Sequence, residues 1–302
     1  MSSDIGAVNN ENGKSAPDSG AAVASSNFWL EALRRLFKNK TAVFALVVFA
    51  IVCISCALHP YLTKYEYMVI DPANTKQGPS LEHLLGTDHL GRDLFTRILY
   101  GGTLTLRISF VSTVLAAAAG CILGLVSGYF GKRTDFILSH LLDMVASVPV
   151  FLLVILAEAA LGWGKGNFMY AMGIAAMPQF ARLIRASVMS IVGSEYIEAA
   201  RALGVGHGEI LARHVLHNVA PSLIIRFTSA FSEALLLCTI MGYLGIAVNP
   251  PTPEWGALAY FGRSFIRSYP HMIIIPCSVI TISVISLGLF GDGLRDALDP
   301  RE

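Results

Sequence analysis

Long apolar segments alternate with shorter polar ones along the chain after about residue 40. Six of them approach or exceed the ~18–20 residues that a helix needs to cross a bilayer. They are residues 42–58, 106–130, 144–161, 167–191, 223–248 and 272–290. The fourth is the weakest, because Arg182 and Arg185 lie near its far end and its uncharged part alone is too short. The pattern predicts an all-α, polytopic membrane protein with six transmembrane helices.

The first forty residues differ from the rest. Residues 1–27 are rich in Ser, Ala, Gly and Asn without apolar periodicity, which predicts a disordered tail and not a secretory signal peptide. Residues 28–40 (FWLEALRRLFKNK) carry apolar side chains at helical spacing together with Arg34, Arg35, Lys38 and Lys40. This segment predicts an amphipathic helix on the membrane surface, before a transmembrane domain over residues 41–302.

Composition agrees with a membrane protein and excludes other classes. Hydrophobic residues make up 54% of the 302 residues and charged residues 14%, against ~25% charged in soluble domains. The net charge is +1 and no large basic block is present, so nucleic acid is not an expected partner. The five cysteines lie in apolar runs without metal-ligand spacing to a histidine, so no metal site is expected.

The distribution of basic residues predicts the orientation. With the N-terminus inside, the cytoplasmic segments hold more Lys and Arg than the outer ones, and the basic cluster lies directly before the first span. By the positive-inside rule, both termini are expected to be cytoplasmic.

The segment 194–221, SEYIEAARALGVGHGEILARHVLHNVAP, is unusually long and polar for a connection between spans. It predicts two short helices, Glu195–Leu203 and Glu209–Leu216, separated by Gly204, Gly206 and Gly208. Ile210 belongs to the apolar stripe of the second helix. Small residues, Ala199, Ala200 and Gly204, leave the turn nearly bare. Such a turn could insert into a groove of a partner protein.

These residues carry a resemblance. Glu198-Ala199-Ala200-x-x-x-Gly204, followed by Val215-x-His217, resembles the EAA loop of permease subunits of ABC importers. Three further segments sharpen it: LGTDHLGRD at 85–93, PPTPEWG at 250–256 and GDGLRDALDP at 291–300. In this order, over about residues 28–300, they resemble the C-type permease of the dipeptide/oligopeptide/nickel class. His217 stands where that family usually has proline.

The resemblance implies a machine of several subunits in the bacterial inner membrane. The EAA-type loop would form a coupling helix seated in a cytoplasmic ATPase that binds ATP and Mg. A homologous second permease would complete a heterodimeric pore, and an extracytoplasmic solute-binding protein would deliver cargo. Short peptides are the cargo implied first, with nickel, haem, glutathione and antimicrobial peptides as alternatives. This chain is not expected to be an enzyme or to hold a cofactor, because G-x-x-x-x-G-K-[ST] is absent.

Two other features lie inside the spans. Gly120, Gly124 and Gly128 share one helix face, which predicts close packing against another helix. Glu158, Arg182, Arg226 and Glu233 are charges in or near spans. Glu233 is deep in its span and is the candidate for the translocation path, with an internal pair as the alternative. Arg182 and Arg226 are expected to reach toward the membrane interface.

The sequence is also compatible with other functional classes. An ion-driven secondary transporter usually shows internal repeats, and no convincing repeat is visible. An intramembrane enzyme would need paired catalytic residues, for which His140 and Asp143 are the nearest candidates. The 85–93 segment fits a structural loop, and the stiff 250–256 loop with Trp255 could either pack internally or contact a delivering protein.

Overall fold

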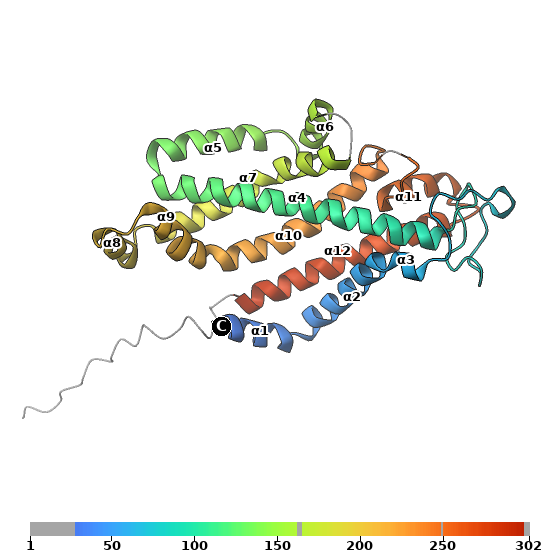
Figure 1. The fold of residues 1–302 in the computed structure, drawn as a ribbon, viewed down its shortest axis with the longest axis horizontal. Helices are drawn as coiled ribbons and strands as arrows, with labels where there is room; N and C mark the ends of the chain where they lie inside the picture. The colour runs from blue at the N-terminus through green and yellow to red at the C-terminus, as the bar shows by residue number, and fades with distance from the viewer. Residues whose placement is uncertain (1–27, 162–164, 249, 299–302) are drawn as a thin grey trace, which may run out of the picture.

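A computed structural model describes residues 28–161, 165–248 and 250–298, so the predicted disordered tail 1–27 lies outside it. In the described part the regular elements are helices: α1 (Phe28–Lys38), α2 (Lys40–Ala57), α3 (His59–Leu62), η1 (Pro72–Asn74), α4 (Leu94–Phe130), α5 (Lys132–Ala146), α6 (Val150–Leu161), α7 (Lys165–Ile191), α8 (Glu195–Ala202), α9 (His207–Glu209), the π-helical turn η2 (Ile210–Val215), α10 (Leu216–Tyr243), α11 (Trp255–Gly262), η3 (Arg263–Phe265) and α12 (His271–Leu298). They form an elongated bundle (Figure 1).

Helix α4 is the central element and runs the length of the bundle (Figure 1). Asp93 caps its first turn by accepting a hydrogen bond from the Thr96 N–H at 2.8 Å. Its 37 residues give a rod of ~55 Å, well beyond the ~30 Å hydrocarbon core. The predicted span 106–130 is therefore only the second part of this helix. The extra turns before residue 106 pack against the connecting segments at the end of the bundle away from α8 (Figure 1).

The predicted count of six spans is not fully matched. Four helices are long and apolar enough to cross a membrane: Lys40–Ala57, Leu94–Phe130, His207–Tyr243 and His271–Leu298. The bent pair α5–α6 makes a fifth if it is counted as one broken span. Helix α7 covers the predicted fourth span, but it does not meet the same test of length and apolarity. Its charged and polar residues explain why.

The predicted third span, residues 144–161, is wrong. Residues 144–161 do not form a single helix, because α5 ends at Ala146 and α6 begins at Val150, with a bend of 94° between them. Pro149 accounts for the break, since a proline lacks the N–H of the helical ladder and disfavours helical geometry at the preceding residue.

The glycine stripe of α4 packs against α7 of the same chain. A Cβ atom on Gly124 would lie 2.6 Å from the carbonyl oxygen of Ala181 and 2.8 Å from Cβ of Ile184. At Gly128 it would lie 2.8 Å from Cβ of Val188. The two backbones are therefore close enough that only glycine fits on this face of α4.

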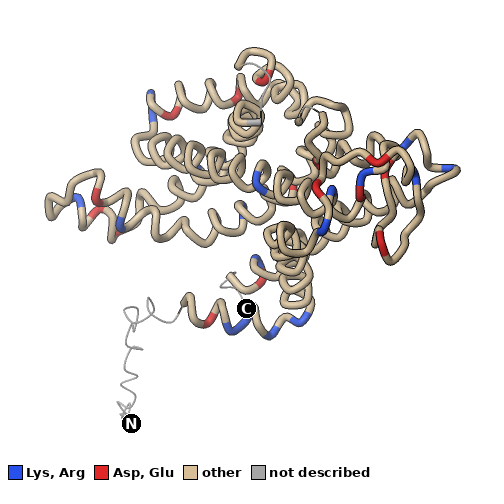
Figure 2. The backbone as a smooth tube through the Cα atoms, turned by 45° about the vertical axis from the view of Figure 1, so that its right-hand side comes forward, with Lys and Arg blue, Asp and Glu red and all other residues tan. Residues whose placement is uncertain are grey.

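Helices α1, α2 and α12 form a layer on one side of the bundle, where α12 packs against α10 and α11 and α2 packs against α4 (Figures 1 and 2). Leu36 on α1 packs with Ala42 and Ala297, while Trp29, Leu30, Leu33 and Phe37 remain exposed. The exposed apolar face agrees with the amphipathic pattern of 28–40, although Asn39 ends α1 and caps α2 by accepting from the Ala42 N–H. Both ends of the described chain lie toward the end that carries α8 (Figure 1).

Candidate coupling surface and translocation pocket

The turn after α8 is built by Gly204. Its φ is +79°, in the left-handed region that glycine enters without steric cost. The Gly204 N–H donates to the Arg201 carbonyl at 3.0 Å, and the Val205 N–H donates to the Ala200 carbonyl at 3.1 Å. These two bonds satisfy the last carbonyls of α8 in a Schellman motif. The helix therefore stops here and the chain reverses at the tip of the molecule.

The predicted coupling residues divide into two groups. Ala200 and Ile210 are buried with Ile197 and Val215 in an apolar cluster that holds the turn against the ends of α4 and α7. The others face outward: Glu198, Ala199, Gly204, Gly206 and Gly208. A Cβ atom on any of the three glycines would meet nothing within 4 Å. The outward face is thus small, bare and open, with Leu203 84% exposed at its edge.

In the second half of the segment 194–221, the predicted helix over residues 209–216 is present, but its predicted limits are wrong. Gly208 does not interrupt a helix, because α9 begins at His207 and continues through η2 into α10. His207–Tyr243 is one continuous helical segment that includes His217 and Pro221. Gly208 lies in the first turn of this helix, where glycine lowers helix stability only slightly. The wider π-helical turn η2 comes shortly before Pro221. The exposed turn itself is limited to Leu203–Gly206.

A polar contact joins this turn to α4. The Tyr129 hydroxyl lies 2.7 Å from Nδ1 of His207. The guanidinium of Arg201 lies over the Tyr129 ring, 5.1 Å from its centroid. Tyr129 therefore contacts residues on both sides of Gly204, and the end of α4 is attached to the turn at two points.

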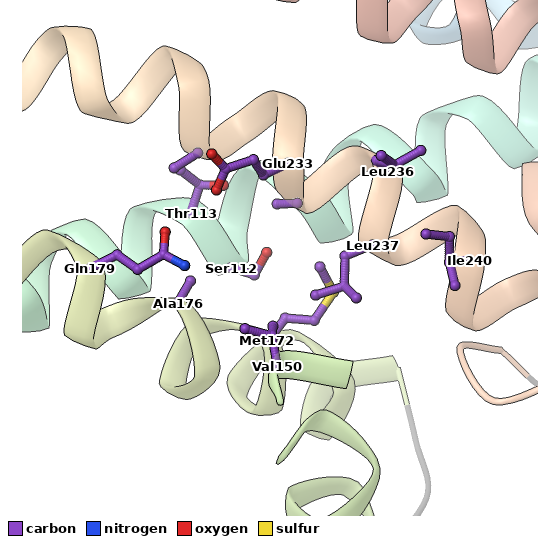
Figure 3. A pocket seen from close by; sticks show the side chains of 12 residues that line it. Ser112, Thr113, Val150, Met172, Ala176, Gln179, Glu233, Leu236, Leu237 and Ile240 are labelled. Carbon is purple, nitrogen blue, oxygen red and sulfur yellow. The ribbon is translucent and has the colours of Figure 1, made fainter. Parts of the chain in front are cut away.

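A pocket of about 290 Å³ lies between α4, α6, α7 and α10. Glu233 and Gln179 turn their polar ends toward one part of it, while Met172, Leu237 and Ile240 line the apolar remainder (Figure 3). Arg226 stands beside the polar end and donates from Nη1 and Nη2 to the two Glu233 carboxylate oxygens, each at 3.0 Å. Its Nη2 also donates to Oε1 of Gln179 on α7.

The structure therefore combines the two alternatives for Glu233. It forms an internal pair with Arg226, and it also lines the pocket with a side chain that is 58% exposed. The expectation that Arg226 reaches the membrane interface is wrong, because its guanidinium points along α10 to Glu233. The contact of Gln179 with Arg226 was not predicted from the sequence. The only indication was a polar amide within an apolar segment.

The other charged residues singled out in the sequence do not form a common site. Arg182 pairs with Asp143 at 2.7 Å between α7 and α5, instead of extending alone to the interface. His140 bonds through Nδ1 to the Phe136 carbonyl, so His140 and Asp143 are not brought together as a catalytic pair. Glu158 is 1% exposed on α6. Among the described residues, no group of three or more His, Cys, Asp or Glu could hold a metal ion.

Two protein-family models match parts of this chain. A family model described as "binding-protein-dependent transport system inner membrane component" matches residues 120–302, more than half of the chain. A second, the N-terminal transmembrane domain of oligopeptide transport permease C, matches residues 27–79. The chain belongs to the binding-protein-dependent permease family. It is thus a multi-pass inner-membrane protein and a permease subunit of an ABC importer.

Relatives of this permease extend over nearly its whole length. The dipeptide transport system permease protein DppC of Alkalihalophilus pseudofirmus is 39% identical over 90% of both chains. The oligopeptide transport system permease protein OppC of Bacillus subtilis is 32% identical over 92% of this chain and 91% of the relative. A chain of the inward-facing MetNI methionine ABC transporter matches the fold with a TM-score of 0.56 at 18% identity, covering 67% of this chain and 96% of that chain.

The 85–93 segment of the permease is a closed structural loop at the opposite end from Gly204. Asp88 accepts from Arg92 Nε at 2.7 Å, and Arg97 Nε lies 3.5 Å from the same carboxylate. His83 Nδ1 lies 2.9 Å from Asp93, which caps α4. These five residues are at most 5% exposed. Buried charges of both signs therefore fix the start of α4, as the structural interpretation of this segment predicted.

The 250–256 loop of the permease packs internally. Trp255 is fully buried, and its indole N–H donates to the Ile98 carbonyl at 2.9 Å. The Glu254 carboxylate caps α11 by accepting from the Ala257 N–H at 3.0 Å and lies 3.1 Å from the Thr105 hydroxyl. Burial raises the pKa of Glu254 to about 7, and hydrogen bonds from the backbone N–H groups of the next residues and from Thr105 partly offset this rise. Trp255 is therefore not free to contact a delivering protein.

Proposed function

We propose that this permease subunit translocates short peptides across the inner membrane by alternating access. It forms one half of a heterodimeric pore with a homologous second permease. A solute-binding protein delivers the peptide from outside, and separate ATPase subunits bind ATP and Mg and hydrolyse the nucleotide. The observation that carries this proposal is the likeness, over nine-tenths of the chain, to a dipeptide permease at 39% identity.

Coupling to the ATPases is assigned to the exposed turn after α8. The face formed by Glu198, Ala199 and Gly204 is bare enough to enter a cleft of an ATPase, while Ala200 and Ile210 hold it from below. The contact of Tyr129 with His207 offers a route by which movement of the turn reaches α4. This assignment places α8 and both termini on the cytoplasmic side, in agreement with the basic cluster before α2.

The translocation path is assigned to the pocket that Glu233 lines. A charged, half-exposed side chain at this depth of an apolar helix is expensive unless it faces water or a partner charge. Glu233 has a partner charge in Arg226 and an open face toward the pocket. Both conditions are compatible with a hydrated path for a polar cargo.

The test is uptake of a labelled dipeptide and a labelled longer peptide by cells that lack this gene. The cells are complemented with wild type, with Gly204→Asp and with Gly204→Asn, a variant that keeps the left-handed backbone without adding a charge. We expect wild type to restore uptake and Gly204→Asp to fail while remaining in the membrane. Peptide uptake that does not depend on the gene would refute the peptide assignment.

Glutathione is the second candidate cargo. The glutathione transport system permease protein GsiD of Pectobacterium atrosepticum is 36% identical over 91% of this chain and 90% of the relative. Because glutathione is itself a tripeptide, the two assignments differ only in selectivity. Competition by unlabelled glutathione against labelled dipeptide separates them: efficient competition favours the glutathione assignment, and its absence favours di- and oligopeptides.

A further inference from the structure

Glu233 lines the polar end of the pocket, and its ion-pair partner Arg226 lies beside it. The Arg226 guanidinium also lies over the ring of Phe180, 5.6 Å from its centroid. Arg226 and Glu233 lie two turns apart on α10, and the guanidinium binds both carboxylate oxygens at 3.0 Å. Gln179 on α7 accepts from the same guanidinium. The Arg226 side chain is 18% exposed and that of Glu233 is 58% exposed. The carboxylate is therefore accessible from the pocket, and the guanidinium lies behind it.

The remainder of the pocket is apolar. Met172, Leu236, Leu237 and Ile240 surround it, with Val150 from α6 closing one side (Figure 3). Ser112 and Thr113 from α4 add hydroxyl groups near the charged end (Figure 3). A volume of about 290 Å³ is at the lower end of the ~300–1,000 Å³ range of small-molecule sites. It suits a ligand with two opposite charges at one end and an apolar side chain.

We propose that this pocket binds the free termini of a short peptide during translocation. The peptide carboxylate takes the place of Glu233 on Arg226, the peptide ammonium binds the released Glu233 carboxylate, and the peptide side chain lies against Leu237 and Ile240. The inference rests on the proposed peptide transport and adds the chemistry by which the pore itself recognises its cargo.

Charge balance supports a zwitterion over a simple ion. The pocket end is neutral when Arg226 and Glu233 are paired, and it stays neutral when a ligand with one charge of each sign opens the pair. One ion pair is exchanged for two, and Gln179 keeps one bond to the guanidinium during the exchange. A ligand with a single charge would instead leave Arg226 or Glu233 without a partner in a pocket with apolar walls, which is costly.

The experiment uses the assembled transporter in lipid nanodiscs without its solute-binding protein, so that selection by that protein does not enter. Binding of labelled Ala-Phe is measured beside N-acetyl-Ala-Phe and Ala-Phe amide, which each lack one terminal charge. We expect each modification to weaken binding by about tenfold or more, because each removes a charge-assisted interaction. Equal binding of all three ligands, or no binding of Ala-Phe at all, would overturn the inference.

Two variants assign each terminus to its residue. In Glu233→Gln, N-acetylation is expected to cause no further loss, while amidation still weakens binding. In Arg226→Gln, the pattern is reversed. Asp143→Asn is the matched control, because Asp143 pairs with Arg182 outside the pocket and its side chain is 62% exposed, close to the 58% of Glu233. Both modifications should weaken binding to this control as in wild type. Unchanged sensitivity in the Glu233 and Arg226 variants would assign the termini elsewhere.

The inference and the proposed function fail separately. Gene-dependent peptide uptake by cells, together with binding that ignores the peptide termini, would refute only the role of the Arg226–Glu233 pair. Loss of gene-dependent peptide uptake would refute peptide transport itself, whatever the nanodiscs bind.

Discussion

The hydroxyl of Tyr129 and Nδ1 of His207 lie 2.7 Å apart, and this contact fastens the last turn of α4 to the first turn of α9. In its first half, α4 contacts the buried carboxylate of Glu254 through Thr105. A single helix therefore touches both the exposed turn and the 250–256 loop. Displacement of the turn can be transmitted along α4, since a helix of this length is stiff compared with its connections.

Tyr129→Phe tests this connection. The substitution removes the hydroxyl and keeps the ring that lies under Arg201. A lost hydrogen bond of ~0.5–1.5 kcal/mol is expected to lower the number of peptides transported per ATP by a few fold, without changing the amount of assembled transporter. The measurement is uptake and ATP hydrolysis in the same proteoliposomes. Wild-type stoichiometry in Tyr129→Phe would mean that this contact does not transmit the movement.

Gly204 is the second test, and three variants separate its two roles. Gly204→Ala strains the left-handed backbone at φ +79° by ~1–2 kcal/mol and adds only a methyl group. Gly204→Asn tolerates the backbone, and Gly204→Asp adds a charge to the bare surface. If docking requires position 204 to carry no charge, Gly204→Asp should lose co-purification with the ATPases, Gly204→Asn should retain most of it, and Gly204→Ala should be intermediate. Equal co-purification for all three would contradict the docking role.

Much of the fold was predictable because it follows from local rules. Apolar segments of sufficient length identified α2, α4, α10 and α12, and Gly204 identified the end of α8. The glycines of α4 indicated a close contact, but the identity of the other helix depends on tertiary structure. The predicted starts of two spans, at residues 106 and 223, were too late, because polar residues continue these helices back to Leu94 and His207. An apolar segment does not mark the end of a helix that extends into a polar environment.

The pocket could be predicted only in part. Glu233 was visible as a charge within an apolar helix. Its partner Arg226, seven residues earlier, lies near the start of the predicted span, and this position led to the prediction that it reaches the interface. An i, i+7 pair becomes visible only when the direction of the Arg226 side chain is known. Gln179 comes from a different helix, and no spacing in the sequence relates the two positions.

Gly124→Ala tests the α4–α7 contact. The new methyl group would lie 2.6 Å from the Ala181 carbonyl oxygen, so the helices must separate. We expect a loss of stability of ~1–3 kcal/mol, measured as a lower melting temperature of the purified transporter. Gly288→Ala on α12 is the control, because nothing lies within 4 Å of the added atom there. In that helix alanine should be neutral or slightly stabilising. Equal melting temperatures for the two variants would mean that α7 yields easily.

Glu254→Gln should change how stability depends on pH. The pKa of Glu254 is raised to about 7 by burial, so the folded protein keeps the proton between pH 4.5 and 7 while the unfolded chain releases it. Ionisation of Glu254 thus favours the unfolded state increasingly as the pH rises through this window, by up to about 3 kcal/mol. The neutral amide of glutamine can accept from the Ala257 N–H and removes this penalty. Relative to wild type, the melting temperature of Glu254→Gln is therefore expected to rise between pH 5 and 8.

The control for this measurement is Glu66→Gln, which changes an exposed carboxylate in the segment before α4. Its melting temperature should follow wild type across the same pH range. Other titrating groups affect all three proteins alike, so the difference between the two variants isolates Glu254. A constant difference between Glu254→Gln and wild type from pH 5 to 8 would mean that the buried carboxyl does not change its charge in this range. The Ala257 N–H and the Thr105 hydroxyl would then stabilise the carboxylate enough to overcome its burial.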